Sequence, residues 1–201
     1  MLHALWFGIC RLAEVPDNSG EKLNIQDFRI LPSFFTFVPV KRLVIIRHAK
    51  SSWSNALIDD FDRPLNDRGK EDAPLMAKKL KDKKVVPDVM ITSPAKRAKS
   101  TCKRFAKVFD IDKKQIVKEP KLYHAAESTI GKICSEIDEK VNVAFVFGHN
   151  PGLTNFVTYS SNLEIDNIPT CGVVVLEISS WKKLGKEKAR AVYFDYPSNT
   201  Q

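Results

Sequence analysis

The stretch LVIIRHAKS, residues 43–51, decides the fold class of this 201-residue chain. Its first four residues are apolar and mostly β-branched, which predicts a short strand buried on both faces. Two further apolar runs, residues 89–91 and 143–147, alternate with segments of helical pattern. Strands that alternate with helices predict an α/β fold: a three-layer sandwich with a mainly parallel central sheet flanked by helices.

Cap and breaker residues predict where the helices begin. Asn66 is a good helix cap, and Pro74 inside the same pattern predicts either a kink or a late helix start. Ser93-Pro94 and Asn150-Pro151 each combine a capping side chain with a proline suited to the first helical position. Further elements are expected as a helix at 129–140 and as strands at 115–119, 173–178 and 191–194.

Residues 1–40 lack the strand–helix alternation, and we interpret them as an accessory or poorly ordered extension before a domain at 41–201. They have neither the basic start and cleavage site of a signal peptide nor the composition of a transit peptide. We therefore expect a cytoplasmic protein, with organelle import through residues 1–40 as the alternative. No run approaches the roughly 18 apolar residues of a membrane helix, so no membrane partner is expected.

The formal net charge is +8, although residues 1–40 hold only three basic against four acidic residues. The domain is therefore basic and should attract anions such as phosphate esters or nucleic acid. Many of the lysines lie on one helical stretch, residues 78–84, where a solvated helix face is the simpler interpretation. Without a recognition helix or an RNA-binding signature, we expect a phosphorylated partner and no nucleic acid.

The four cysteines stand far apart without CxxC spacing, which argues against a zinc site and against a disulfide framework. Cys102 and Cys134 fall at positions expected to face inward on helices, where they would act as small buried hydrophobes. We therefore expect no metal in this protein.

Three short segments follow strands of the expected sheet, at the edge where open α/β sheets bind ligands. Arg47 and His48 end the first strand, Arg97 follows the second, and His149 follows the strand at 143–147. Each has a structural alternative, such as a basic helix surface or a satisfied turn histidine. Jointly they indicate phosphate chemistry, because arginine forks match phosphate oxygens and a neutral histidine can attack phosphorus. The arginines should lower the pKa of His48 and keep it neutral.

Four ordered motifs resemble those of the histidine phosphatase (phosphoglycerate mutase-like) superfamily. LVIIRHAKS is similar to its RHG motif, with Ala49 in place of glycine, and RPLNDRG at 63–69 is similar to its PL(T/N)xxG segment. SPAKRAKST at 93–101 resembles SPxxRAxxT, and FGHNPG at 147–152 resembles the GHNPG form of the second-histidine motif. With LYHA at 122–125, these motifs look most like the SixA-type phosphohistidine phosphatase branch, over about residues 41–195.

The resemblance implies a phosphatase without metal or cofactor, in which His48 forms a covalent phosphohistidine. Arg47, Arg97 and His149 would hold and stabilise the phosphoryl group, with Asn150 as a further phosphate-binding residue. The substrate would be phosphohistidine in a protein or a small phosphorylated molecule. The alternatives are an inactive phosphate-binding or scaffolding module of the same fold and a mutase, which the short chain disfavours.

The general acid is less well specified. Glu127 is one candidate, although its Ser128-Thr129 context suits a helix cap as well, and a structural role is favoured over a catalytic one. Asp60, Asp62 and His124 are the alternatives. An acid matters less for a phosphorus–nitrogen bond, because a protonated imidazole leaves easily, and this fits phosphohistidine as the substrate.

Overall fold

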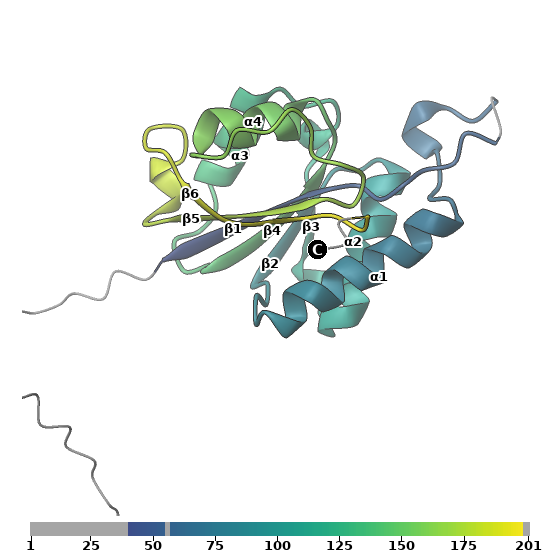
Figure 1. Ribbon diagram of the computed structural model, residues 1–201, viewed down its shortest axis with the longest axis horizontal. Coiled ribbons are helices and arrows are strands. Elements are labelled where there is room, and N and C mark those ends of the chain that lie inside the picture. The colour runs from purple at the N-terminus through teal and green to yellow at the C-terminus, as the bar shows by residue number, and fades with distance from the viewer. Residues whose placement is uncertain (1–39, 55–56, 199–201) are drawn as a thin grey trace, which may run out of the picture. The chain divides into compact units, whose positions relative to one another are not determined.

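Six strands form one mixed sheet in the order β3-β2-β4-β1-β5-β6. The computed structural model describes residues 40–54 and 57–198 (Figure 1), so the predicted extension at 1–40 lies outside the described residues except for Val40. Strands β1 to β4 run parallel, whereas β5 is antiparallel to both β1 and β6. The strands are β1 Lys41–Arg47, β2 Val89–Thr92, β3 Ile116–Lys118, β4 Val143–Gly148, β5 Val173–Ile178 and β6 Arg190–Asp195.

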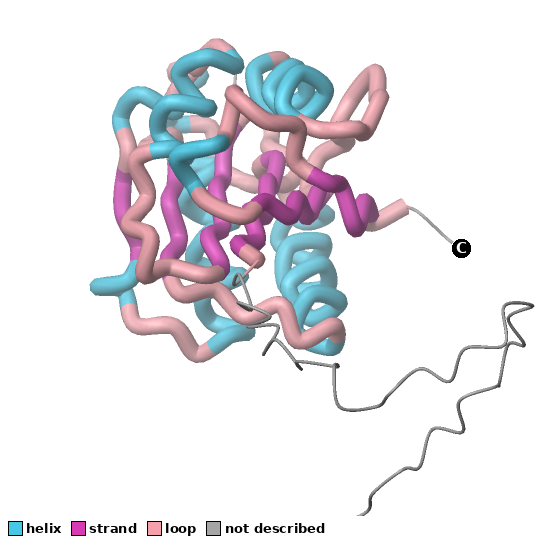
Figure 2. The backbone as a smooth tube through the Cα atoms, turned by 90° about the vertical axis from the view of Figure 1, so that its left-hand side faces the viewer, coloured by secondary structure: helices cyan, strands magenta, loops and turns pink. Residues whose placement is uncertain are grey.

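Helices cover both faces of this sheet. Helices α1 (Asp67–Asp82) and α2 (Lys96–Phe109) lie on one face, and α3 (Glu127–Ser135) and α4 (Gly152–Ser160) lie on the other (Figures 1 and 2). The predicted three-layer α/β sandwich is thereby confirmed. Four 3-10 turns complete the described chain: η2 Asp60–Asp62, η3 Lys113–Gln115, η4 Pro120–Leu122 and η5 Trp181–Lys183.

The central strand β1 contributes side chains to both cores. Val44 and Ile46 pack in the core beneath α1 and α2, whereas Leu43 and Ile45 pack in the core beneath α3 and α4. All four are fully buried, because a strand with helices on both faces exposes neither of its two side-chain rows. Each such side chain contributes about 1.5–3 kcal/mol to stability, which makes β1 a rigid base for the residues that follow it.

Two predicted helix starts are wrong. Helix α2 begins at Lys96, and its cap residue Ala95 makes no side-chain cap. The Ser93 hydroxyl accepts only a long hydrogen bond from the Ala95 N–H at 3.4 Å, and its shorter bond, at 2.8 Å, is to His149 Nε2. Helix α4 begins at Gly152, three positions after His149, with Pro151 as its cap residue. The amide of Asn150, the expected cap, bonds instead to Asn167 and to the Ile168 carbonyl.

The other helix boundaries follow local chemistry more closely. Asn66 caps α1 as predicted, with its side chain accepting from the Gly69 N–H at 2.9 Å. The helix begins directly at Asp67 and continues through Pro74, so the late start did not occur. Helix α3 spans 127–135 rather than 129–140, because a turn at Asp138 precedes β4.

Cys102 and Cys134 are fully buried, which confirms their predicted inward positions. Among the described residues, no helix is long and apolar enough to span a lipid bilayer.

The turn after β4 packs tightly against the segment that precedes α3. A Cβ atom placed on Gly152 would lie 1.9 Å from the Ala125 carbonyl oxygen, so this position accepts only glycine without movement. The contact holds Ala125, the residue after His124, against Gly152, three residues after His149.

We expect Gly152→Ala to destabilise the domain by about 1–3 kcal/mol, because either α4 or the Ala125 backbone must shift. The matched control is Gly131→Ala in α3, where the added Cβ would meet the Phe156 ring at an ordinary 3.6 Å. That control should hold or gain stability, since alanine suits a helix interior better by about 1 kcal/mol. Urea unfolding of both variants checks this, and equal stability of the two would contradict the packing argument.

Candidate active site

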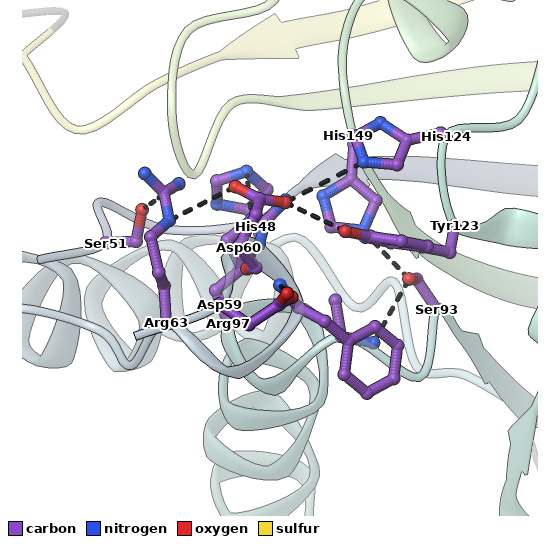
Figure 3. Close-up of polar contacts among 12 residues, drawn as sticks. His48, Ser51, Asp59, Asp60, Arg63, Ser93, Arg97, Tyr123, His124 and His149 are labelled. Atoms are coloured by element: carbon purple, nitrogen blue, oxygen red, sulfur yellow. Dashed lines mark hydrogen bonds and ion pairs between the residues drawn. The ribbon is translucent and has the colours of Figure 1, made fainter. Parts of the chain in front are cut away.

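The carboxyl ends of β1, β2 and β4 bring distant segments of the chain to one place, with His48 at the centre (Figure 3). The His48 backbone is held on both sides: its N–H donates to the Gly148 carbonyl at 3.1 Å, and its carbonyl accepts from the Cys171 N–H at 3.2 Å. The next N–H, of Ala49, donates to the Thr101 hydroxyl on α2 at 3.0 Å. The position of His48 is therefore fixed by neighbouring strand ends and a helix.

The imidazole of His48 is fixed in one tautomer. Nδ1 lies 2.9 Å from the Ala49 carbonyl oxygen, which only accepts hydrogen bonds, so Nδ1 carries the proton. Nε2 consequently keeps its lone pair, and it accepts a hydrogen bond from Arg97 Nε at 3.2 Å. A buried imidazole whose Nε2 lone pair is not protonated is the form of histidine that acts as a nucleophile.

The surroundings keep His48 uncharged. Burial lowers its pKa to about 4; the hydrogen bond to Ala49 opposes this shift, and the charges of Arg97, Arg47 and Arg63 reinforce it. The direction agrees with the expectation from the sequence, but burial contributes more than the arginines do. Above about pH 4 the ring is therefore a neutral base surrounded by cations.

His149 lies beside His48, with the two ring centroids 5.0 Å apart. Its Nε2 is hydrogen-bonded to the Ser93 hydroxyl at 2.8 Å, whereas its buried Nδ1 has no partner among the described residues. Burial, followed by the charges of His48 and Arg97, lowers the pKa of His149 to about 3. Ser93, a residue that the sequence indicated only as a helix cap, thus orients the second histidine.

Arg97 lies on the first turn of α2 with 4% of its surface exposed. Besides the bond to His48, its Nη2 donates to Asp60 Oδ2 at 2.9 Å and its Nη1 donates to the Asp60 carbonyl. Arg47 is held differently, because its Nη1 donates to the Ile168 carbonyl at 2.6 Å and to Asn167 Oδ1. The two arginines are therefore anchored to different segments of the chain.

Asn150 shares the partners of Arg47. Its Nδ2 donates to Asn167 Oδ1 at 2.8 Å and to the Ile168 carbonyl at 3.1 Å. The structure therefore places Asn150 where it braces the 167–168 segment against Arg47, with Oδ1 buried and without a partner among the described residues.

Arg63 is a third arginine of the site, and the sequence reasoning gave it no role. It is 7% exposed, donates to the Ser51 hydroxyl at 3.0 Å and pairs with Asp60 Oδ1 at 3.3 Å. Its guanidinium also lies 3.4 Å from the centroid of the Trp53 ring. The signal in the sequence was its place at the head of the RPLNDRG motif, directly after the acidic stretch that contains Asp60.

The four candidates for the general acid lie at different distances from the site. Asp60 Oδ2 accepts from the Tyr123 hydroxyl at 3.0 Å and lies 3.7 Å from His124 Nε2 (Figure 3), so these residues border the site. Asp62 is exposed and points to no described partner. Glu127 lines a groove of about 310 Å³ between α3 and α4, together with Phe156. Of the four, Asp60 pairs with the site arginines, and His124 lies next to Asp60.

Within residues 40–54 and 57–198, no group of three His, Cys, Asp or Glu side chains is arranged to hold a metal ion.

We expect the domain to lose stability as the pH falls from about 7 to about 5. Unfolded histidines bind a proton near pH 6.5, whereas His48 and His149 in the fold resist protonation until about pH 4 and about pH 3. The unfolded state therefore takes up protons in this window, at a cost to the fold of up to about 1.4 kcal/mol per pH unit for each histidine. Urea midpoints of wild type and His149→Asn measure this: the variant should show the shallower pH dependence, and equal slopes would contradict the burial argument.

Three comparisons with known proteins agree with this geometry. Residues 43–150 match the family model of the histidine phosphatase superfamily (branch 1). An uncharacterised chloroplastic protein of Arabidopsis thaliana is 28% identical over 169 residues, which cover 79% of this chain and 76% of the relative.

Two solved structures share the fold. SixA of Agrobacterium tumefaciens, provisionally assigned as a phosphohistidine phosphatase, superposes with a TM-score of 0.68 at 27% identity, over 79% of this chain and 99% of the other. The protein histidine phosphatase SixA in complex with tungstate has a TM-score of 0.69 at 20% identity, over 80% and 99% of the two chains. The family match and these structures lead to one conclusion: this chain belongs to the histidine phosphatase superfamily, on its SixA-like branch.

Proposed function

We propose that this protein is a metal-independent phosphatase that forms a covalent phosphohistidine on His48. One observation carries the proposal: buried N–H groups without an acceptor among the described residues surround a neutral histidine. They are Arg47 Nε, Arg63 Nη1 and His149 Nδ1, if the last nitrogen carries the ring proton. Buried donors are normally paired, and phosphate oxygens are acceptors that match both their charge and their number.

The first half of the reaction transfers the phosphoryl group to the enzyme. The Nε2 lone pair of His48 forms a bond to phosphorus, and the bond to the leaving group breaks, with its electron pair returning to that group. Arg97, Arg47 and Arg63 neutralise the charge on the three equatorial oxygens, which is most of what catalysis of phosphoryl transfer requires. His149 faces the same phosphoryl group from the β4 side of the site.

The second half releases phosphate. Water attacks phosphorus, the bond to Nε2 breaks, and its electron pair restores the lone pair of His48. Both protons of the water leave with the product, which is released as dihydrogen phosphate. Nδ1 keeps its proton throughout, because the Ala49 carbonyl accepts its hydrogen bond at every stage. The enzyme therefore returns to its starting tautomer without a separate proton relay to His48.

The proposed substrate is phosphohistidine in a protein or a small phosphorylated molecule. The support is the 27% identity to the Agrobacterium protein, which bears a phosphohistidine phosphatase assignment and is covered over 99% of its length. Asn150 would act indirectly, by holding the segment to which Arg47 is bonded. Because three arginines neutralise the charge of the phosphoryl group, no step of this scheme depends on a metal ion.

His48→Ala should abolish turnover of p-nitrophenyl phosphate, assayed in EDTA, while the fold is kept. The reason is that His48 Nε2 offers an unprotonated imidazole lone pair beside Arg97, whereas His149 Nε2 is bonded to the Ser93 hydroxyl. Rapid alkaline quench, which preserves the phosphorus–nitrogen bond, followed by mass spectrometry should find one added phosphoryl group on the His48 peptide of wild type and none in the variant. Full activity of a folded His48→Ala protein would refute the nucleophile. Phosphate binding by wild type without any turnover would instead support the binding-module alternative.

Arg97→Ala should lower kcat/KM by at least about tenfold, because a hydrogen bond to a charged group contributes about 1.5–3 kcal/mol. Arg104→Ala is the matched control on the same helix, since within the described part of the chain the Arg104 side chain bonds only to the Ser100 carbonyl of its own helix. Steady-state kinetics of the two variants should differ by that factor. Equal kinetics would show that Arg97 does not engage the phosphoryl group.

A further inference from the structure

The Asp60 carboxylate lies beside Arg63 and Arg97, where it meets groups from three segments of the chain (Figure 3). Oδ2 accepts from Arg97 Nη2 and from the Tyr123 hydroxyl, and Oδ1 pairs with Arg63 Nε at 3.3 Å. The side chain is 42% exposed, so it borders solvent on one side and the buried arginines on the other. A negative charge is thus built into a site that otherwise gathers positive charge.

The Asp60 carboxylate and His48 Nε2 both accept hydrogen bonds from the same edge of the Arg97 guanidinium. Arg97 donates from Nε to His48 Nε2 at 3.2 Å and from the neighbouring Nη2 to Asp60 Oδ2 at 2.9 Å. Because these two N–H groups of a guanidinium point in nearly the same direction, their acceptors lie side by side. A phosphoryl group that bonds to His48 Nε2 therefore has Asp60 as an immediate neighbour.

Asp60 is ionised in this arrangement. Burial alone would raise its pKa, but the hydrogen bonds from Tyr123 and Arg97, with the charges of Arg97 and Arg63, hold the pKa below its ordinary value. An ionised carboxylate has no proton to give to a departing alkoxide, and it repels any leaving group that becomes an anion. It favours a leaving group that carries positive charge.

Two aromatic rings lie next to the same carboxylate. The His124 ring is 63% exposed at its side chain, and its centroid lies 4.1 Å from that of Tyr123. His124 has a positive φ of 51°, a conformation that few non-glycine residues adopt, and its ring lies next to Asp60. A flat heteroaromatic leaving group would therefore find ring surfaces next to the carboxylate.

We propose that Asp60 is a specificity-determining residue that selects substrates with a phosphorus–nitrogen bond over phosphate esters. The inference rests on the proposed function, and it deepens that function by naming the substrate class and the residue that chooses it. For a phosphorylated imidazole, Asp60 stabilises the ring that is protonated on its second nitrogen. His48 Nε2 then bonds to phosphorus, the phosphorus–nitrogen bond breaks, and its electron pair returns to the nitrogen. Neutral imidazole leaves without further proton transfer.

The experiment compares phosphoimidazole with p-nitrophenyl phosphate in wild type, Asp60→Asn and Asp60→Glu. Asp60→Asn should lower kcat/KM for phosphoimidazole by about tenfold, the equivalent of about one pKa unit in the protonated substrate. For p-nitrophenyl phosphate the same variant should lose less kcat/KM, because the lost repulsion of nitrophenolate offsets the weaker hold on Arg97, so the ratio of phosphoimidazole to ester turnover falls. Asp60→Glu keeps the charge and should keep the preference for phosphoimidazole.

Asp62→Asn is the matched control, since Asp62 lies on the same 3-10 turn, is exposed and makes no side-chain hydrogen bond or ion pair among the described residues. It should leave the ratio of the two substrates unchanged. Equal loss on both substrates in Asp60→Asn would overturn the inference, as would a wild type that hydrolyses only the ester. A wild type inactive on both, without a trapped phosphoenzyme, would overturn the proposed function and this inference with it.

Discussion

The hydrogen bond from His48 Nδ1 to the Ala49 carbonyl is the interaction on which the rest of the site depends. A buried imidazole is neutral, but burial alone does not decide which nitrogen holds the proton. The carbonyl decides it, since it can only accept. Gly148 and Cys171 hold the His48 backbone, and Thr101 holds the next N–H, so the carbonyl cannot turn away. The backbone therefore fixes the proton on Nδ1 and leaves the lone pair on Nε2.

The site is also deficient in negative charge. Arg63 and Arg97 are less than a tenth exposed, and Asp60 is the one carboxylate among the described residues that pairs with both. Buried cations with too few acceptors cost stability, and proteins keep such arrangements where a ligand relieves them. The apolar burial in the two cores on either side of β1 offsets the free-energy cost of these buried cations. The same excess of positive charge would hold a phosphoryl group.

The strand ends were predictable from the sequence, whereas the contacts between loops were not. The rule that ligands bind at the carboxyl ends of parallel strands is enough to group Arg47, His48, Arg97 and His149. It is silent about Asp60, which lies on a short 3-10 turn outside the strand–helix pattern. It is equally silent about Ser93, whose hydroxyl has the chemistry of a helix cap but bonds to a histidine more than fifty residues later. Such long-range partners overrule local propensity most often where a site is assembled.

The burial of the cysteines protects them from oxidants and alkylating agents. Cys102 and Cys134 are sealed in the two cores, and burial raises the pKa of each thiol to about 12. Peroxide and alkylating agents react with thiolates, and these two cysteines hold almost no thiolate at neutral pH. An imidazole nucleophile is itself inert to mild oxidants. Neither the proposed nucleophile nor these two cysteines is therefore a target of mild oxidants, unlike the catalytic thiolate of a cysteine-dependent phosphatase.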